Sequence, residues 1–91
     1  MRLLTIKTNN NEIQINVPEN MKFLIGKGGR SKVVENNQIP LGHFLNHSNT
    51  DLFEVFENAT ITELQKLQKL INVTTDSKRA KQVLSLIEQV L

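Results

Sequence analysis

Apolar and polar residues alternate in two short segments near the start of the chain. In residues 12–17 every second residue is apolar, which is the period of a β-strand with one buried face. Residues 2–8 alternate more weakly but are rich in Leu, Ile and Thr, and an Asn triplet at 9–11 separates the two segments. Two such segments around an Asn-rich turn predict a β-hairpin, and Pro18 ends its second strand because it has no backbone N–H to donate.

The last third of the chain has the period of a helix. Apolar residues recur three or four positions apart at Ala80, Val83, Leu84, Ile87 and Leu91. This spacing predicts a C-terminal amphipathic helix capped by Thr75 or Asp76. Thr60 and Glu63 have the spacing of a capping box and predict another helix start, although residues 70–74 are also compatible with a short strand.

The middle of the chain is less regular. Residues 21–25 carry apolar side chains at positions i, i+3 and i+4, which predicts a short helix capped by Asn20 and ended by three glycines within residues 26–29. A second short helix is expected over residues 30–34. For residues 50–56 the alternation of apolar and acidic side chains favours a strand over an amphipathic helical turn.

Length and composition restrict the classes of protein to which this chain can belong. With 91 residues it is expected to form one small domain. It contains no cysteine, which excludes a disulfide scaffold, a thiolate metal site and a cysteine nucleophile. The apolar share of 38% is low for a globular domain but sufficient for a small core of Leu, Ile, Val and Phe.

The sequence contains no signal for a membrane. No stretch reaches the roughly 18 consecutive apolar residues of a membrane span, and the first residues lack the apolar region of a signal peptide. We therefore expect a soluble intracellular protein in the cytoplasm, with the nucleus as an alternative, and no membrane partner.

Charge is distributed unevenly along the chain. Residues 1–40 contain six Lys or Arg and three Glu, for a net charge of +3, whereas residues 41–64 contain four acids and no base, for −4. Residues 65–91 contain five bases and two acids, for +3, so that the whole chain has a net charge of +2. Basic ends around an acidic middle indicate one surface that faces an anion.

The most informative segment is residues 25–32, with the sequence Ile-Gly-Lys-Gly-Gly-Arg-Ser-Lys. Glycines let the backbone approach a ligand closely, and backbone amides beside a helix start bind anions. Lys27, Arg30 and Lys32 add positive charge at the same place. These features point to phosphate as the ligand, and the alternative is a solvated basic turn.

Together with the predicted strand and short helix before it, this segment resembles the KH domain, a nucleic-acid-binding module with the signature Ile-Gly-X-X-Gly. The matching residues are Gly26, Lys27, Gly28 and Gly29, preceded by Leu24 and Ile25. Residues 71–87 are similar to the final strand, polar turn and C-terminal helix of the type I arrangement. The resemblance covers roughly residues 12–37 and 67–91.

The resemblance implies an α+β fold in a single domain over residues 1–91. It would contain a small three-stranded antiparallel sheet and three helices, with the glycine loop between two short helices. Residues 1–11 would form an extra N-terminal strand and turn, placing a strand at the edge of the sheet, and residues 36–66 would form a variable insertion.

The function that the resemblance implies is non-enzymatic binding of single-stranded RNA or DNA, without a cofactor or a metal. The loop would clamp the phosphate backbone, the cations would neutralise phosphates, and apolar side chains would form a floor for the bases. The residues expected to contact nucleic acid are Lys22, Leu24, Ile25, Gly26, Lys27, Gly28, Gly29, Arg30, Lys32 and Val33.

Catalysis and metal binding have little support in the sequence. His43, His47 and Asp51 are spaced four apart, which would suit a metal on one continuous helix. Gly42 and the polar residues 47–50 interrupt that spacing, so we expect surface histidines in a loop. A Ser48–His43–Asp51 trio has no accompanying nucleophile motif.

The main rival function is protein binding. In this alternative the chain is a KH-like protein-interaction module, or a small regulator, that docks onto a larger protein or ribonucleoprotein assembly. The acidic segment 51–63, with three apolar side chains near its start, would provide the docking surface.

Overall fold

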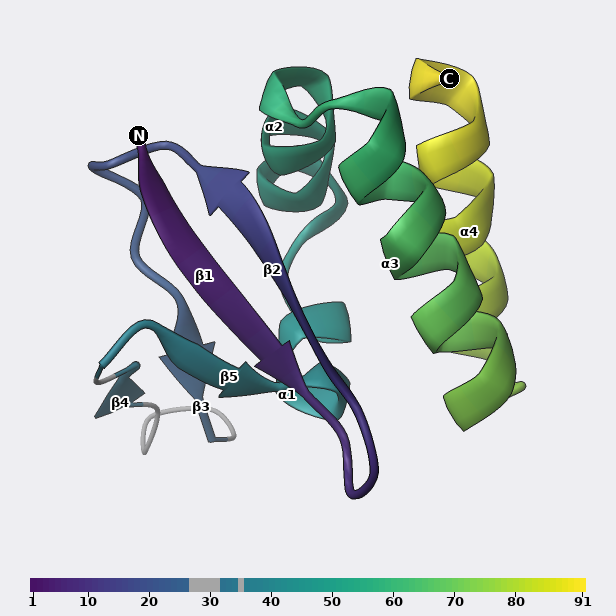
Figure 1. The fold of residues 1–91 in the computed structure, drawn as a ribbon, viewed down its shortest axis with the longest axis horizontal. Coiled ribbons are helices and arrows are strands. Elements are labelled where there is room, and N and C mark those ends of the chain that lie inside the picture. Colours follow the sequence, from purple (N-terminus) through teal and green to yellow (C-terminus); the bar gives the residue numbers. More distant parts are fainter. Residues whose placement is uncertain (27–31, 35) are drawn as a thin grey trace.

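A computed structural model of the chain describes residues 1–26, 32–34 and 36–91, in which five strands precede four helices (Figure 1). The elements are β1 (Arg2–Lys7), β2 (Glu12–Val17), β3 (Leu24–Ile25), β4 (Lys32–Val33), β5 (Gln38–Pro40), α1 (Leu41–Leu45), α2 (Asn49–Asn58), α3 (Ile61–Thr74) and α4 (Lys78–Val90). The predicted α+β class is confirmed. None of the helices in the described ranges is long and apolar enough to cross a membrane.

The predicted N-terminal hairpin is confirmed. β1 and β2 pair in antiparallel fashion, with a register that runs from Arg2 opposite Val17 to Lys7 opposite Glu12. The turn is closed by the N–H of Thr8, which donates to the carbonyl oxygen of Asn11 at 2.8 Å. β2 ends at Val17, directly before Pro18.

β1 lies in the centre of a mixed three-stranded sheet of order β2-β1-β5. β5 pairs with β1 in parallel, with Ile39 opposite Ile6. The expectations of a purely antiparallel sheet and of an edge position for the first strand are therefore wrong. Leu4 and Ile6 of β1 are fully buried on one face of the strand, whereas Leu3 and Lys7 on the other face are exposed.

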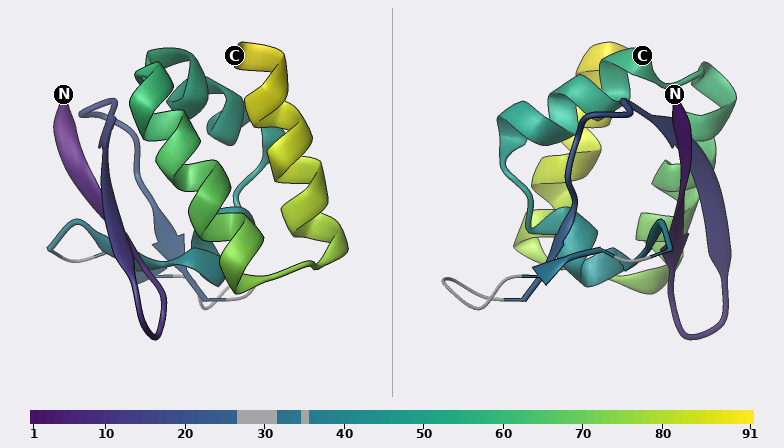
Figure 2. Two further views of the ribbon diagram at one scale, coloured as in Figure 1. Left: turned by 45° about the vertical axis from the view of Figure 1, so that its right-hand side comes forward. Right: turned by 90° about the vertical axis from the view of Figure 1, so that its left-hand side faces the viewer.

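The helices form a layer beside the sheet. Figures 1 and 2 show α3 and α4 running side by side, with the β1–β2 hairpin on the other side of α3. The described residues form four helices where three were expected, and the segment 36–66 contains β5, α1, α2 and the first turns of α3. This segment supplies much of the core, including the fully buried Phe44 and Phe56.

The prediction of a strand at residues 50–56 is wrong, and the helical alternative is correct. Ser48 caps α2, because its side-chain oxygen accepts a hydrogen bond from the N–H of Asp51 at 3.2 Å. The buried residues Leu52, Val55 and Phe56 follow the i, i+3, i+4 spacing of one helix face.

The capping box at Thr60 and Glu63 is confirmed and begins α3. α3 continues to Thr74, so the final strand that the resemblance implied around residue 71 is absent from the described structure. Leu70 and Ile71 are buried and extend the apolar face of this helix. The C-terminal helix is confirmed, but its cap is Ser77, whose hydroxyl accepts from the N–H of Ala80 at 3.1 Å.

Glu63 ties the start of α3 to the sheet. Its carboxylate accepts from the backbone N–H of Thr60 at 2.9 Å and from the backbone N–H and side-chain amide of Asn16 at 2.7 and 3.2 Å. Burial opposes ionisation of this carboxylate, but the hydrogen bonds outweigh it and lower the pKa of Glu63.

We expect Glu63→Gln to reduce the free energy of unfolding by about 1 kcal/mol at pH 7. Because the folded-state pKa is lowered, the stabilisation is present above the unfolded pKa and disappears as the pH falls through the folded pKa. The difference between the wild type and Glu63→Gln should therefore shrink between pH 5 and pH 3, measured by urea unfolding. Glu57→Gln, at an exposed site on α2, is the matched control, and equal effects from both variants would contradict the prediction.

Candidate functional site

The basic glycine segment is carried by a second hairpin, formed by β3 and β4. The two strands pair in antiparallel fashion, with Leu24 opposite Val33 and Ile25 opposite Lys32. The N–H of Val34 extends the pairing by donating to the carbonyl oxygen of Phe23 at 2.8 Å. We refer to residues 22–34 as the basic hairpin.

The prediction of two short helices around the glycines is wrong, because the described residues on the two sides form strands, β3 before the glycines and β4 after them. Burial alternates along this stretch, with Phe23 buried, Leu24 exposed and Ile25 half-buried, which is the period of a strand. Five residues are also too few to offset the cost of starting a helix without strong packing. The groove between two helices that the KH resemblance implied is therefore not present in the described structure.

Gly26 has a φ of 123°, a backbone conformation that glycine adopts and other residues rarely do. This residue follows directly after the last residue of β3. The predicted contacts of Lys27, Gly28, Gly29 and Arg30 lie outside the described residues.

The described part of the basic hairpin combines positive charge with apolar surface. Lys22 and Lys32 are exposed, and residues 22–34 contain four Lys or Arg and no acid. Leu24 and Val33 face each other across the strands and remain 42% and 54% exposed. Ile25, by contrast, packs against the core and attaches the hairpin to the body of the protein.

A groove of about 370 Å³ runs beside β4. It is lined by Arg2, Glu19, Asn20, Met21, Lys22, Phe23, Val33, Val34 and Asn37. Its volume lies at the lower end of the range for small-molecule sites. Lys22 and Val33 belong to both the groove and the exposed surface of the basic hairpin, so the two features form one continuous candidate site.

Arg2 positions one wall of this groove, a role that sequence reasoning missed. Its guanidinium donates to the carbonyl oxygens of Pro18, Glu19 and Met21 and to the side-chain oxygen of Asn37. It also lies over the ring of Phe23, with 5.6 Å between its central carbon and the ring centroid. The signal in the sequence is weak, because a single Arg beside an apolar run indicates no partner.

The two histidines brace the basic hairpin. His47 Nε2 accepts a hydrogen bond from the N–H of Leu24 at 2.9 Å, and His43 Nδ1 accepts from the N–H of Gly26 at 3.4 Å. Both imidazoles are half-buried, and the His47 ring contacts the rings of Phe23 and Phe44. The prediction of surface histidines in a loop is wrong for His43, which lies in α1. His47 does lie in the connection between α1 and α2, but its side chain is half-buried.

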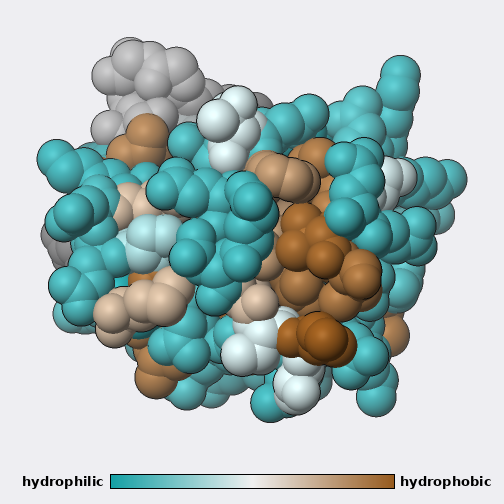
Figure 3. Space-filling view, turned by 90° about the horizontal axis from the view of Figure 1, so that it is seen from above, coloured by the Kyte–Doolittle hydropathy of each residue, from teal (hydrophilic) through white to brown (hydrophobic). Residues whose placement is uncertain are grey.

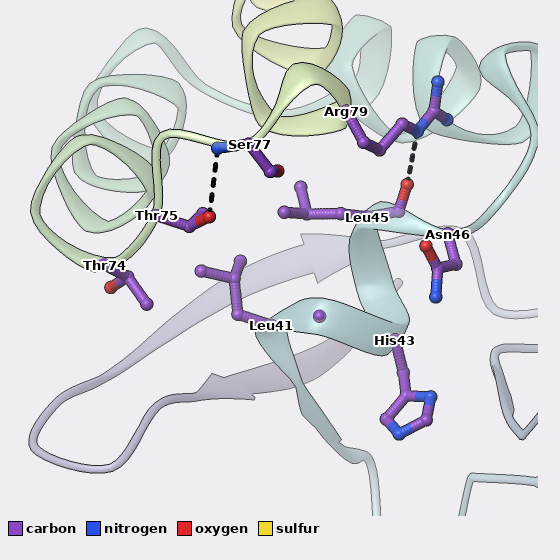
Figure 4. A pocket seen from close by; sticks show the side chains of 9 residues that line it. Leu41, His43, Leu45, Asn46, Thr74, Thr75, Ser77 and Arg79 are labelled. Atoms are coloured by element: carbon purple, nitrogen blue, oxygen red, sulfur yellow. Dashed lines mark hydrogen bonds between the residues drawn. The ribbon is translucent and has the colours of Figure 1, made fainter.

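A second groove, of about 440 Å³, lies between α1 and the connection from α3 to α4 (Figure 4). Arg79 borders it and donates from Nε to the carbonyl oxygen of Leu45 at 2.6 Å and from Nη2 to that of His47 at 2.5 Å. Its Nη1 donates to the side chain of Asn49 at 2.6 Å. This arginine therefore binds the carbonyl end of α1, where a cation is favourable.

Ser48, one of the candidate catalytic residues in the sequence, has a structural role, because it is the N-cap of α2. Within the part of the chain that the structure describes, no group of three or more His, Asp or Glu side chains is placed to hold a metal ion.

An apolar patch forms a distinct surface feature, visible on one half of the face in Figure 3. Two exposed apolar residues lie at the neighbouring ends of the long helices: Ile61 at the start of α3 is 65% exposed, and Leu91 after α4 is 50% exposed.

No protein-family model, no curated protein and no solved structure matches this chain.

Proposed function

We propose that this chain binds a single-stranded nucleic acid, RNA or DNA, through the basic hairpin and the adjoining groove, without catalysing a reaction. The observation that carries the proposal is the concentration of four cations and no acid within residues 22–34, on a hairpin with an exposed apolar pair. Cations bind phosphates, and an apolar surface beside them accepts unstacked bases.

The charges around the site favour one placement of the phosphate backbone of the bound strand. Lys22 also borders a hollow that contains Asp51 and Glu54, whose negative charge repels phosphates. Lys32 lies on the other strand of the hairpin, opposite Ile25, and is exposed. We therefore place the phosphate backbone along β4 and the bases toward Val33 and the groove.

Fluorescence anisotropy with short single-stranded RNA and DNA tests the proposal. The double variant Lys27→Glu/Lys32→Glu is compared with Lys66→Glu/Lys69→Glu on the exposed face of α3, because both pairs change the net charge from +2 to −2. We expect the hairpin variant to lose at least about tenfold in affinity and the α3 variant to change by about twofold or less. Each lost phosphate contact should also reduce the salt dependence by about 0.7 log units per log unit of salt.

Two results would contradict the proposal. Equal weakening by both variants would indicate a general effect of net charge. Absence of binding by the folded wild type at tens of micromolar would remove the function itself. Far-UV circular dichroism of both variants confirms that each one is folded.

The protein-docking alternative is favoured by a different observation, the exposed apolar residues Ile61 and Leu91 at the ends of α3 and α4. Large exposed apolar patches often mark interaction surfaces. This alternative becomes the leading one if the wild type binds neither RNA nor DNA.

A further inference from the structure

Besides the packing of Phe23 and Ile25, two hydrogen bonds in which an imidazole is the acceptor join residues 24–26 to His43 and His47. The shorter one runs from the N–H of Leu24 to His47 Nε2 at 2.9 Å, and the longer from the N–H of Gly26 to His43 Nδ1 at 3.4 Å. A backbone N–H always donates, so each contact requires a ring nitrogen that carries no proton.

The surroundings of His47 specify where its single proton lies. Nδ1 is 3.0 Å from the carbonyl oxygen of His43 and 3.1 Å from that of Phe44. Carbonyl oxygens only accept, so Nδ1 carries the hydrogen and Nε2 is left as the acceptor for Leu24. The neutral ring therefore has a partner at both nitrogens.

Protonation of His47 would place a second hydrogen on Nε2, directly facing the N–H of Leu24. Two donors cannot bond to each other, and the contact is lost. We propose that His47 is a proton-operated latch: its neutral imidazole holds β3 against α1, and its protonation breaks the hydrogen bond to Leu24 and weakens this attachment. The contact of His43 is longer and contributes less.

The Arg79 guanidinium beside the latch disfavours a further positive charge on a docked imidazolium, because it donates to the carbonyl oxygen of His47. Lys32 lies opposite Ile25 on the neighbouring strand and is exposed. Asp51, in the first turn of α2, contributes the carboxylate of that element. Among the described residues no carboxylate forms an ion pair with either imidazole, so the docked state offers the added charge no opposite partner.

An imidazolium has no lone pair left to accept from the Leu24 N–H, so docking weakens as the protonated fraction of His47 rises. The latch does not depend on nucleic-acid binding, whereas any effect of this weakening on affinity rests on the proposed function.

Nuclear magnetic resonance of the wild type tests the latch without a variant. The ring nitrogens of His47 and the amide of Leu24 are followed together from pH 8 to pH 5. We expect both to change with one midpoint. We also expect the hydrogen exchange of the Leu24 amide, corrected for its intrinsic pH dependence, to accelerate about fivefold relative to the amide of Leu67 in α3.

Two variants assign the effect to one residue. His47→Phe keeps an aromatic ring beside Phe23 and Phe44 but has no acceptor, so the Leu24 amide should exchange rapidly at every pH. His43→Gln should leave the pH dependence of Leu24 in place. The latch is overturned if the Leu24 amide stays constant while His47 gains its proton, or if His47 stays neutral to pH 5. If His47→Phe does not fold, the wild-type titration decides alone.

Discussion

Replacing Phe44 with alanine is expected to lower the free energy of unfolding by about 3–5 kcal/mol. Phe44 is fully buried in α1, and its ring centroid lies 6.2 Å from that of Phe23 and 6.4 Å from that of His47. The substitution removes the ring and leaves a cavity where α1 meets β3. Urea unfolding followed by circular dichroism at pH 7 measures the loss.

Phe53→Ala is the matched control, because Phe53 lies on α2 and is only half-buried. We expect it to lose clearly less stability than Phe44→Ala, since less apolar area returns to water. If Phe44→Ala is unfolded, Phe44→Leu keeps part of the volume and should lose roughly 1–2 kcal/mol. Equal losses at Phe44 and Phe53 would show that the contacts of Phe44 with the rings of Phe23 and His47 add no stability beyond that of a half-buried ring.

The second large effect is expected at Arg2, where alanine should lower the free energy of unfolding by about 2–3 kcal/mol. The substitution removes the donor shared by the carbonyl oxygens of Pro18, Glu19 and Met21. It also removes the cation over the Phe23 ring. Urea unfolding gives the magnitude, and amide shift changes should be concentrated in residues 18–23 and 36–38.

Arg2→Lys separates charge from geometry. A lysine ammonium lacks the planar fork of donors that reaches several carbonyls at once, so this variant should recover only part of the stability. Lys7→Ala, an exposed cation on the same strand, should change stability by roughly 0.5 kcal/mol or less. Wild-type stability of Arg2→Lys would contradict the role that we assign to the guanidinium.

The elements that could be predicted from the sequence are those with a local signal. The β1–β2 hairpin has strand periodicity on both sides of an Asn turn, and α3 begins with a complete capping box. α4 has an apolar stripe over its whole length. Each signal lies within a few residues of the structure that it specifies, so no tertiary information is needed.

The errors concern structure that depends on distant contacts. β3 and β4 are two residues long, too short to show a period, and their pairing across the glycine segment determines their conformation. In residues 50–56 the apolar side chains fit both periods, and burial of Leu52, Val55 and Phe56 on one face decides for a helix. The central position of β1 depends on β5, which no local pattern near residue 5 indicates.

The position of the candidate site could be predicted from the cations and glycines in the sequence. The residues that hold the basic hairpin in place could not. Lys22, Lys32, Leu24 and Val33 do lie on one exposed hairpin. The histidines and Arg2 act through hydrogen bonds to backbone atoms, and a backbone atom gives no sequence signal. Such partners become visible only once the chain is folded.

The parallel pairing of β1 with β5 has a consequence for the order of folding. The β1–β2 hairpin closes a short turn, a step that takes microseconds in typical hairpins. The pairing of Thr5 with Gln38 joins residues 33 positions apart, and the entropy of closing that loop must be overcome before the pairing is formed. The basic hairpin lies inside this loop. A local opening of β5 would therefore break the parallel pairing while the β1–β2 hairpin keeps its own antiparallel register.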